Sequence, residues 1–453
     1  MNETSAAVID WLRGDLSGIR MPVHPGALRA GGADFLTRAF HASGALTADN
    51  RVTRVTRFEA WRGGSTGNKV LLSVAYENSN PALHTELFVK FSRDFEDPLR
   101  DQYRGQMESE CRFGALSRAS GFPIAVPVCY FADFHSESGS GILITQRIAF
   151  GVNGVERHYE KCLDYEIDGA LEHYRALVTA LARLAGSHRG GRLQGIVADQ
   201  FPFDSSKMNV TDVAPFTERQ LQSRISRLAE FICEFPGLVP PSLRDPAFIP
   251  HLSRGAAQFA QHNGDIERCL RGQPDFIALC HWNANIDNAW FWRNESGALE
   301  CGLLDWGHVS QMPVAMSLWG CLSAAELQIW ERHLGELLTL FISEYKRSGG
   351  PSLDPDELKL HLNLHVAQMG LRWLLDVPAF VRLRVPDLAA ARNRLDTRIR
   401  LLEDVRSRLH MMTTFLSLWK LQDFSAALNQ CLDQCLKGYA SLLSQTTTAL
   451  RNS

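Results

Sequence analysis

A short polar stretch carries the residues of this chain whose types and spacing could do chemistry. Residues 281–288, HWNANIDN, lie between the apolar runs 276–280 and 289–292, and a further mostly apolar run over 299–304 ends at Asp305. These runs predict short strands with a polar loop between them. Polar groups at the end of a buried strand must be hydrogen-bonded or used in binding. A polar β-turn without function is the bland alternative.

This loop resembles the catalytic loop of the aminoglycoside phosphotransferase and choline kinase families, which are relatives of the protein kinases. Their loop reads H-x-D-x-x-x-x-N, and a metal-binding Asp follows on the next hairpin, often as I/L-D-W/F. His281, Asn288 and Asp305 fall on this pattern, whereas Asn283 stands where the families have the catalytic Asp. The resemblance implies phosphoryl transfer, with Asn288 and Asp305 as oxygen ligands of Mg²⁺ and ATP or GTP as co-substrate.

The amide at Asn283 leaves the catalytic role of the loop open. An amide can orient a hydroxyl group, but it cannot accept a proton as a carboxylate does. Asp287 is a second candidate for that role, although it lies in another register, and His281 completes the predicted catalytic set. Three interpretations follow: a small-molecule O-phosphotransferase with an altered loop, a nucleotide-binding pseudokinase that acts as a regulatory or interaction module, and an enzyme that transfers a nucleotidyl group.

A glycine-rich turn in the amino-terminal third predicts a phosphate-binding element. Residues 52–91 are expected to form three antiparallel strands, and the first turn contains Gly63, Gly64, Ser65 and Thr66. Small residues let a backbone approach phosphate closely and donate N–H groups to it. Glycine-rich hairpin turns are also common for steric reasons, so the motif is weak by itself.

Two charged residues are predicted to complete the nucleotide site. Lys90 lies in the third expected strand, where the resemblance places the lysine that contacts the nucleotide phosphates, and Lys69 beside the turn is its competitor. A helix expected over 106–117 carries Glu110 and Glu108. Glu110 is favoured as the partner of Lys90 because the following residues match the E-x-x-F-x-x-L pattern of the family.

The resemblance implies an α+β, bilobal protein-kinase-like fold, with an antiparallel sheet lobe at the amino terminus and a larger, mostly helical lobe at the carboxy terminus. We expect a helical extension over 1–50, a nucleotide-binding sheet lobe over 51–150, a catalytic-loop lobe over 151–325 and a helical carboxy-terminal part over 326–453. Several long helices are predicted in that last part, among them 389–410 and 424–443.

Composition limits the remaining possibilities. The 453 residues carry a net charge of −3 with no basic block, which points away from nucleic acid and from anionic membranes. There is no apolar run of 18 residues and no signal-like segment at residue 1, so we expect a cytoplasmic protein that does not span a membrane. The ten cysteines are predicted to be buried thiols, and Cys431 and Cys435 alone are weak evidence for a metal. The acceptor substrate and the oligomeric state are not predicted.

Overall fold

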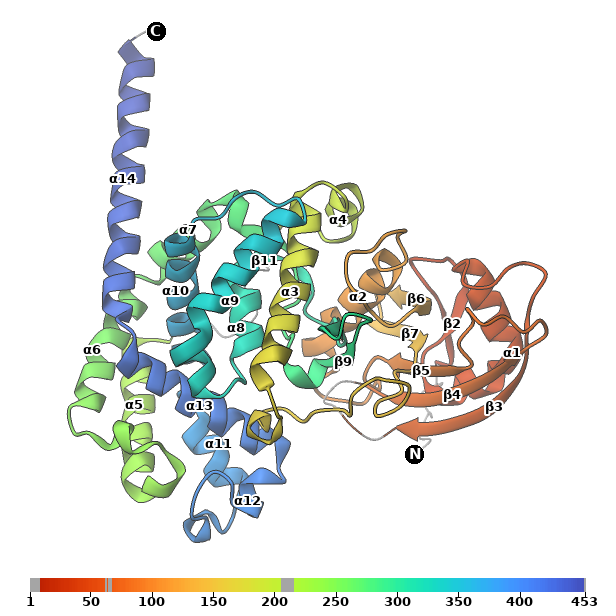
Figure 1. Cartoon of the computed structure of the whole chain (residues 1–453), viewed down its shortest axis with the longest axis horizontal. Coiled ribbons are helices and arrows are strands. Elements are labelled where there is room, and N and C mark those ends of the chain that lie inside the picture. Colours follow the sequence, from red (N-terminus) through yellow and green to blue (C-terminus); the bar gives the residue numbers. More distant parts are fainter. Residues whose placement is uncertain (1–8, 62, 64–66, 205–215, 452–453) are drawn as a thin grey trace, which may run out of the picture. The chain divides into compact units, whose positions relative to one another are not determined.

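The computed structural model describes residues 9–61, 63, 67–204 and 216–451, with side chains up to residue 437. The chain forms two compact units (Figure 1). Unit 1 consists of Met1–Arg157, Gly195–Pro202 and Asn288–Ser310, and unit 2 of His158–Gln194, Phe203–Asp287 and Gln311–Ser453. Unit 1 is built on an antiparallel sheet and unit 2 is mostly helical, so the predicted α+β class is confirmed.

The sheet of unit 1 has five strands in the order β3-β4-β5-β7-β6, and every neighbouring pair is antiparallel. The strands are β3 (Val52–Trp61), β4 (Lys69–Tyr76), β5 (Glu86–Phe91), β6 (Cys129–His135) and β7 (Ser140–Gln146). The three strands predicted over 52–91 are therefore present. Their alternating side chains allow one face to be apolar while selected residues point the other way.

The amino-terminal extension was predicted to be helical, and this is wrong for its first part. The structure has two short strands, β1 (Trp11–Arg13) and β2 (Arg20–Pro22), before helix α1 (Pro25–Ala42). Pro25 stands in the first turn of α1, where its missing N–H costs nothing. Gly32 interrupts the helix at φ 48°, a value that disfavours any residue with a Cβ atom.

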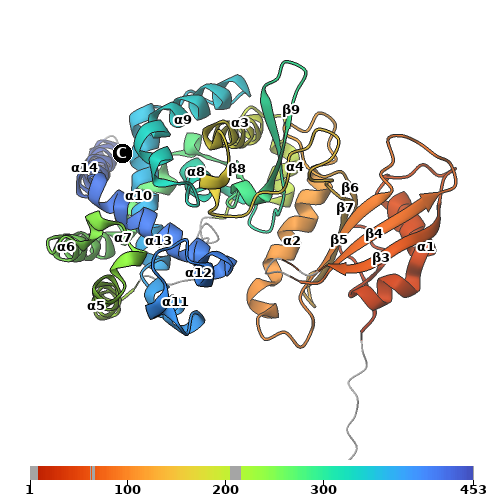
Figure 2. The same cartoon turned by 60° about the horizontal axis from the view of Figure 1, so that its bottom comes forward.

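Helices cover both faces of the sheet in unit 1, as Figure 2 shows for α1 and for α2 (Arg100–Leu116). On one face, α1 contributes Phe35 to a core that includes Val89, Ile142 and Ile144. On the other, α2 packs against strands β6 and β7, where Met107 and Cys111 meet Phe134 and Leu143. Adjacent residues of β7 thus pack into the cores on opposite faces of the sheet, as the two-residue period of a strand requires.

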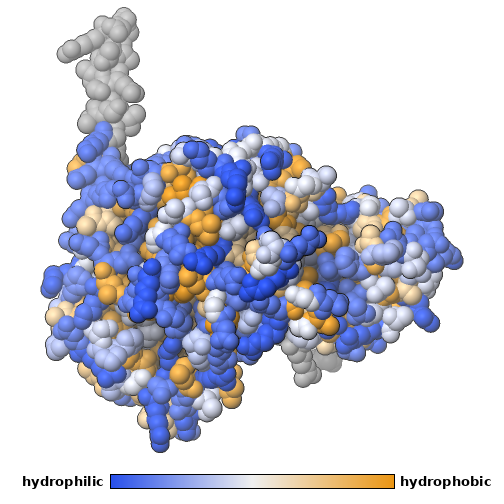
Figure 3. All heavy atoms as spheres, viewed as in Figure 1, coloured by the Kyte–Doolittle hydropathy of each residue, from blue (hydrophilic) through white to orange (hydrophobic). Residues whose placement is uncertain are grey.

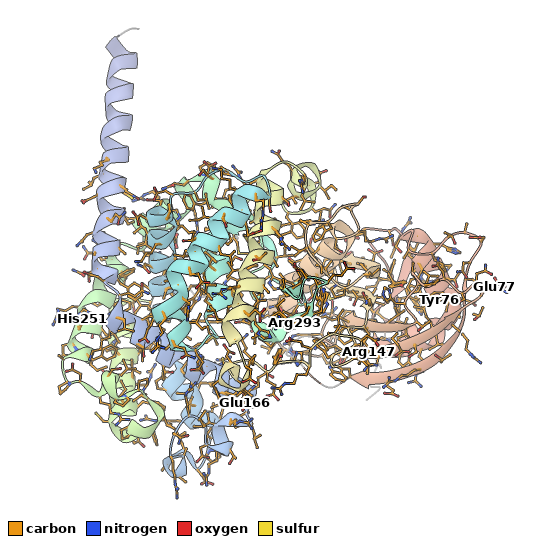
Figure 4. All side chains as sticks on the ribbon, viewed as in Figure 1. Tyr76, Glu77, Arg147, Glu166, His251 and Arg293 are labelled. Atoms are coloured by element: carbon orange, nitrogen blue, oxygen red, sulfur yellow. The ribbon has the colours of Figure 1, made fainter. Side chains whose placement is uncertain are left out.

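A hairpin late in the sequence also belongs to unit 1. Strands β9 (Ala289–Arg293) and β10 (Leu299–Leu303) pair antiparallel, and Arg293, labelled in Figure 4, donates to Gly297 O at 2.9 Å across the turn. The sequence assigned these residues to the lobe over 151–325. The structure instead groups 288–310 with the amino-terminal sheet, because β10 bridges Ala125 through Gly302 and the residues after it pack on α2.

Unit 2 is a helical assembly that holds the short strand β8 (Ile277–Cys280), which pairs with β11 (Ser310–Pro313). Helix α3 packs on α9 and on β8, and α10 packs on α8. The helices are α3 (Ala170–Arg189), α4 (Gln194–Gln200, mostly in unit 1), α5 (Glu218–Glu234), α6 (Phe248–Gln261), α7 (Asn263–Gly272), α8 (Val314–Leu322), α9 (Leu327–Arg347), α10 (Pro355–Trp373), α11 (Val377–Arg384), α12 (Thr397–Arg400), α13 (Glu403–Leu421) and α14 (Phe424–Arg451).

The helix predicted over 389–410 is divided in the structure. Asp396 caps the short helix α12 by accepting from Arg398 N, and Leu402 has extended backbone angles before α13 begins. The N-cap at Asp396 begins a short helix, and the extended residue Leu402 separates it from α13, so the predicted helix does not run through as one element. Helix α14 continues well past the other helices of unit 2 (Figure 1).

The surface in Figure 3 is mostly hydrophilic, with hydrophobic residues scattered over the described part of the face shown. No helix in the described ranges combines the length and the apolar character that a membrane crossing needs.

Candidate functional site

Strand alternation turns Lys90 away from the α1 core of unit 1. Its neighbours Val89 and Phe91 both belong to that core, so the side chain of Lys90 emerges on the face that α2 covers. Glu110 is on α2, buried between the turns that carry Met107 and Phe113. The strand and the helix together bring the lysine and the glutamate to the same side of the sheet.

Lys90 forms a buried ion pair with two carboxylates of unit 1. Its Nζ lies 2.6 Å from Glu110 Oε1 and 3.0 Å from Asp305 Oδ1. The side chains of Lys90 and Glu110 are 10% and 3% exposed, whereas that of Asp305 is 42% exposed. Lys90 therefore contacts Glu110, its expected partner, and also Asp305. Asp305 offers the solvent-accessible carboxylate of the three-residue group.

Burial and the neighbouring charges shift the pKa values of Lys90 and Glu110. Burial by itself would lower the pKa of Lys90, but the negative charges of Asp305 and Glu110 outweigh burial and raise that pKa above its ordinary value. Burial raises the pKa of Glu110 to about 7, against the opposing pull of Lys90. Two hydrogen bonds to separate carboxylates favour the charged ammonium of Lys90, and the neighbouring carboxylates repel each other.

Aromatic stacking holds Asp305 against α2. Trp306, the next residue, stacks on Phe113 with ring centroids 3.6 Å apart and planes at 11°, and its indole donates to Leu303 O at 3.2 Å. Asp305 itself has φ 61°, a left-handed conformation that Asp tolerates better than most residues. The stack explains the E-x-x-F and L-D-W patterns together: Phe113 lies three residues after Glu110, and Trp306 directly follows Asp305.

The backbone of Asn288 is hydrogen-bonded to Leu304, the residue before Asp305. Asn288 ends the single 3₁₀ turn Ile286–Asn288, and its carbonyl accepts from Leu304 N at 2.8 Å. Asn288 precedes β9 and Asp305 follows β10, so both oxygen-bearing residues lie at the same end of this hairpin. Carboxylate and amide oxygens are ligands that suit Mg²⁺.

Only part of the predicted phosphate turn can be placed. Gly64, Ser65 and Thr66 lie outside the described residues, whereas Gly63 accepts from Lys69 Nζ at 2.7 Å through its carbonyl. Gly67 has φ 55°, and a Cβ atom on it would lie 1.8 Å from Phe91 O. The turn therefore closes onto the end of β5, next to Lys90, only with glycine at position 67.

The competing lysine faces the same side as Lys90. Lys69 on β4 pairs in register with Lys90 on β5. Burial, and then the positive charge of Lys90, lowers the pKa of Lys69 to about 8. The two candidates are thus neighbours on one face rather than exclusive alternatives. A pocket of unit 1 lies beside them, and its lining residues include Gly67, Lys90, Ser92, Tyr103, Gln106 and Glu110.

The predicted catalytic loop lies in unit 2, where its own hydrogen bonds and contacts with α8 hold it. His281 is buried, and its Nδ1 accepts from Asn283 N at 3.0 Å. Ser317 on α8 donates to His281 O at 3.2 Å. Gly320, one turn further along α8, passes so close that a Cβ atom would lie 1.5 Å from Trp282 O. The loop geometry is therefore fixed by α8 as well as by its own hydrogen bonds.

Sequence reasoning missed a lysine at this loop. Lys161 Nζ lies 3.4 Å from Asn283 Oδ1, and the side-chain amides of Asn283 and Asn285 lie 2.6 Å apart. Arg406 on α13 positions the segment by donating to Lys161 O at 3.0 Å. Lys161 is about 120 residues before the loop in a stretch without a motif, so no local signal marks it.

Asp287, the second catalytic candidate, is at the end of the loop in unit 2. Nε2 of His158 lies 3.0 Å from the backbone carbonyl oxygen of Asp287. The side-chain Oδ1 is buried and has no hydrogen-bond partner among the described residues. Such an orphaned oxygen is costly unless it binds something. His188, by contrast, accepts from Leu279 N at 3.1 Å and supports β8.

No protein-family model and no curated protein matches the chain. Among solved structures it is similar to the GDP complex of wild-type aminoglycoside 2′-phosphotransferase-IIIa, at 14% identity over 78% of this chain and 93% of that one, with a TM-score of 0.37. It is also similar to choline kinase from Cryptosporidium parvum Iowa II (12% identity, 84% of this chain and 90% of that one, TM-score 0.39) and to a microcompartment-associated aminopropanol kinase (13%, 85% and 96%, TM-score 0.40). At TM-scores below 0.5 we transfer no residue role from these proteins.

Proposed function

We propose that this chain is a small-molecule phosphotransferase that transfers the γ-phosphate of ATP or GTP to a hydroxyl group. One observation carries the proposal: Lys90 bridges Glu110 and Asp305 in a group that is buried on the lysine side and open at Asp305. A buried cation held by two carboxylates is expensive to form for stability alone. It suits a site that must place a positive charge against phosphate oxygens.

The residues of unit 1 fit a Mg²⁺ ion. Asn288 and Asp305 supply an amide and a carboxylate oxygen, and the backbone contact between Asn288 and Leu304 keeps them adjacent. The exposed carboxylate of Asp305 is the natural charged ligand for a hard cation. When bound, Mg²⁺ would neutralise phosphate charge. Lys90 would contact the phosphates, Glu110 would keep Lys90 in place, and Lys69 would add a second positive charge.

The loop of unit 2 supports a role in holding the acceptor. Asn283 would orient the hydroxyl group by hydrogen bonding, because its amide cannot take the proton. A loose phosphoryl-transfer transition state depends more on positioning and electrostatics than on a general base, so turnover is compatible with an amide. Asp287 is the alternative proton acceptor, and its orphaned Oδ1 favours keeping it in the test.

A second candidate function is a nucleotide-binding pseudokinase that acts as a regulatory or interaction module. Asn283 favours this candidate, since it replaces the carboxylate that the resembling families use, and Lys161 adds a positive charge beside it. Both candidates require Mg-nucleotide binding at unit 1. They differ in whether any acceptor is phosphorylated.

The test has two stages. First, the thermal stability of the full chain is measured with ATP or GTP, with and without Mg²⁺, since a ligand that binds the folded state raises the melting temperature. We expect a Mg²⁺-dependent rise in the wild type and none in Asp305→Asn. Exposed Glu77 at the end of β4, labelled in Figure 4, gives the matched control Glu77→Gln.

Second, ADP or GDP release is measured over a library of hydroxyl-bearing metabolites. Release that needs both Asp305 and a particular acceptor supports the phosphotransferase. Nucleotide binding without turnover on any acceptor supports the pseudokinase. No thermal shift at millimolar nucleotide, with the fold intact, overturns both candidates.

A further inference from the structure

A second group of reactive side chains in unit 2 comes from helices that carry none of the loop residues described above. Cys269 on α7 and Glu357 and His361 on α10 place a thiol sulfur, a carboxylate oxygen and a ring nitrogen within 4.8 Å of one another. Cys269 and His361 are buried. Helix α7 packs on both α10 and α14. Three chemically different metal-ligating atoms therefore converge at a helix junction.

Helix α14 places two further thiols beside this group. Cys431 and Cys435, one turn apart, donate to Asp265 O on α7 at 3.8 and 3.7 Å, one turn before Cys269. Cys269, Cys431 and Cys435 are all free thiols. On a helix, residues four apart share a face, so α10 presents Glu357 with His361, and α14 presents Cys431 with Cys435.

The buried imidazole points independently to a ligand. The His361 side chain is fully buried, and neither of its ring nitrogens has a hydrogen-bond partner among the described residues. Its Nε2 lies 3.3 Å from Glu357 Oε1 without the geometry of a hydrogen bond. Buried polar groups are nearly always paired, and an unpaired imidazole nitrogen beside a thiol and a carboxylate is the arrangement that a metal ion satisfies.

Two glutamines orient the carboxylate. Gln273 donates to Glu357 Oε1 at 2.6 Å, and Gln434 on α14 donates to Glu357 Oε2 at 2.9 Å. Gln434 also accepts from Cys269 Sγ at 3.6 Å. Metal ligands are commonly fixed by such outer hydrogen bonds, which hold each donor atom in the direction of the ion.

We propose that Cys269, Glu357 and His361 form a zinc site, called here the Cys–His cluster. A thiolate, an imidazole and a carboxylate make a ligand set of the borderline-soft kind that Zn²⁺ prefers, and three protein ligands leave the fourth tetrahedral position to water. Mg²⁺ and Ca²⁺ prefer oxygen ligands alone. Ligands at about 2.0–2.3 Å from Zn²⁺ lie about 3.3–3.8 Å apart, so the cluster contracts by about 1 Å on binding. The ion would join α7 to α10.

The test is the metal content of the full chain. Purified protein is stripped with a chelator under reducing conditions, reloaded with Zn²⁺ alone and analysed by mass spectrometry of the metal. We expect one Zn²⁺ per chain. Cys269→Ser and His361→Gln should each weaken Zn²⁺ binding by at least about 100-fold, and Gln434→Leu by about 10–100-fold, since outer-shell partners typically contribute that much.

Two variants serve as matched controls. Cys233→Ser removes an exposed thiol, and His365→Gln removes a buried imidazole on the same helix, one turn from His361. Neither should change zinc affinity, and circular dichroism verifies the fold of each variant. Equal loss in His365→Gln and His361→Gln would overturn the site, because packing of α10 would then explain it. Folded, reduced wild type that takes up no Zn²⁺ would overturn it as well.

Discussion

Two regions of this chain differ in the charge that they carry at the predicted functional positions. In unit 1, Lys90 is bonded to Glu110 and Asp305, so the group contains three ionisable side chains. In unit 2, the loop position that would carry a carboxylate under the family resemblance holds Asn283, whose side-chain contacts include the amide of Asn285 and the ammonium of Lys161. The charges expected for phosphate and metal are present, whereas the expected proton acceptor is replaced by an amide.

Under the proposed function, the difference separates nucleotide binding from turnover. Removing one member of a buried charged group leaves an uncompensated buried charge and carries a large penalty. A loop amide is a milder change, because orientation of a hydroxyl group by a hydrogen bond survives it. The following substitutions test each side of this comparison.

The largest effect is expected from Asp305→Asn. The substitution removes the exposed negative charge next to Asn288, which would hold Mg²⁺, and leaves shape and packing nearly unchanged. We expect Mg²⁺-dependent nucleotide binding to weaken by at least about 100-fold and any turnover to disappear. Isothermal titration with Mg-ATP measures the first and product release the second. A turnover that Asp305→Asn leaves intact would place the chemistry elsewhere in the chain.

Lys90→Met should unfold the protein more easily. It leaves Glu110, with a side chain only 3% exposed, as a buried carboxylate without its cation. Removing one partner of a buried pair typically costs about 3–5 kcal/mol of unfolding free energy. Urea denaturation gives the value, and Lys90→Met with Glu110→Gln together should recover part of the loss. The exposed pair of Arg51 and Glu77 provides the contrast, since Glu77→Gln should cost about 1 kcal/mol or less.

Variants of Asn283 test the role of the unit 2 loop in turnover. Asn283→Ala should lower kcat about tenfold by removing one orienting hydrogen bond. Asn283→Asp should raise kcat or leave it nearly unchanged, because a carboxylate restores a proton acceptor and Lys161, 3.4 Å from the present Oδ1, would stabilise its charge. Steady-state kinetics on an identified acceptor measures both. Full activity in Asn283→Ala together with inactive Asp287→Asn would assign the role to Asp287.

The smallest effect is a pH dependence from Lys69. Its pKa is lowered to about 8, so Lys69 is charged below that pH and neutral above it. Nucleotide affinity should therefore fall as pH rises from 7 to 9, by about fivefold for one partly exposed ion pair worth about 1 kcal/mol. Lys69→Arg should abolish this decline because arginine stays charged. An identical decline in Lys69→Arg would exclude Lys69 as its source.

Local patterns in the sequence determined much of unit 1. The apolar run Leu87–Phe91 predicted the strand that the structure has as β5, whereas the roles of Lys90 and Glu110 came from the family resemblance. The strand prediction succeeds because a two-residue period encodes which side chains share a face. The helical prediction over 1–50 failed where strands of three residues are too short to show a period.

Tertiary structure alone decided which distant residues meet. Lys90 and Asp305 are 215 residues apart, Lys161 and Asn283 are 122 apart, and Cys269 is 165 residues from Gln434 on α14, to which it donates. It also decided that 288–310 belong with the amino-terminal sheet rather than with the loop that precedes them. A period reports one face of one element, whereas packing determines which faces come together.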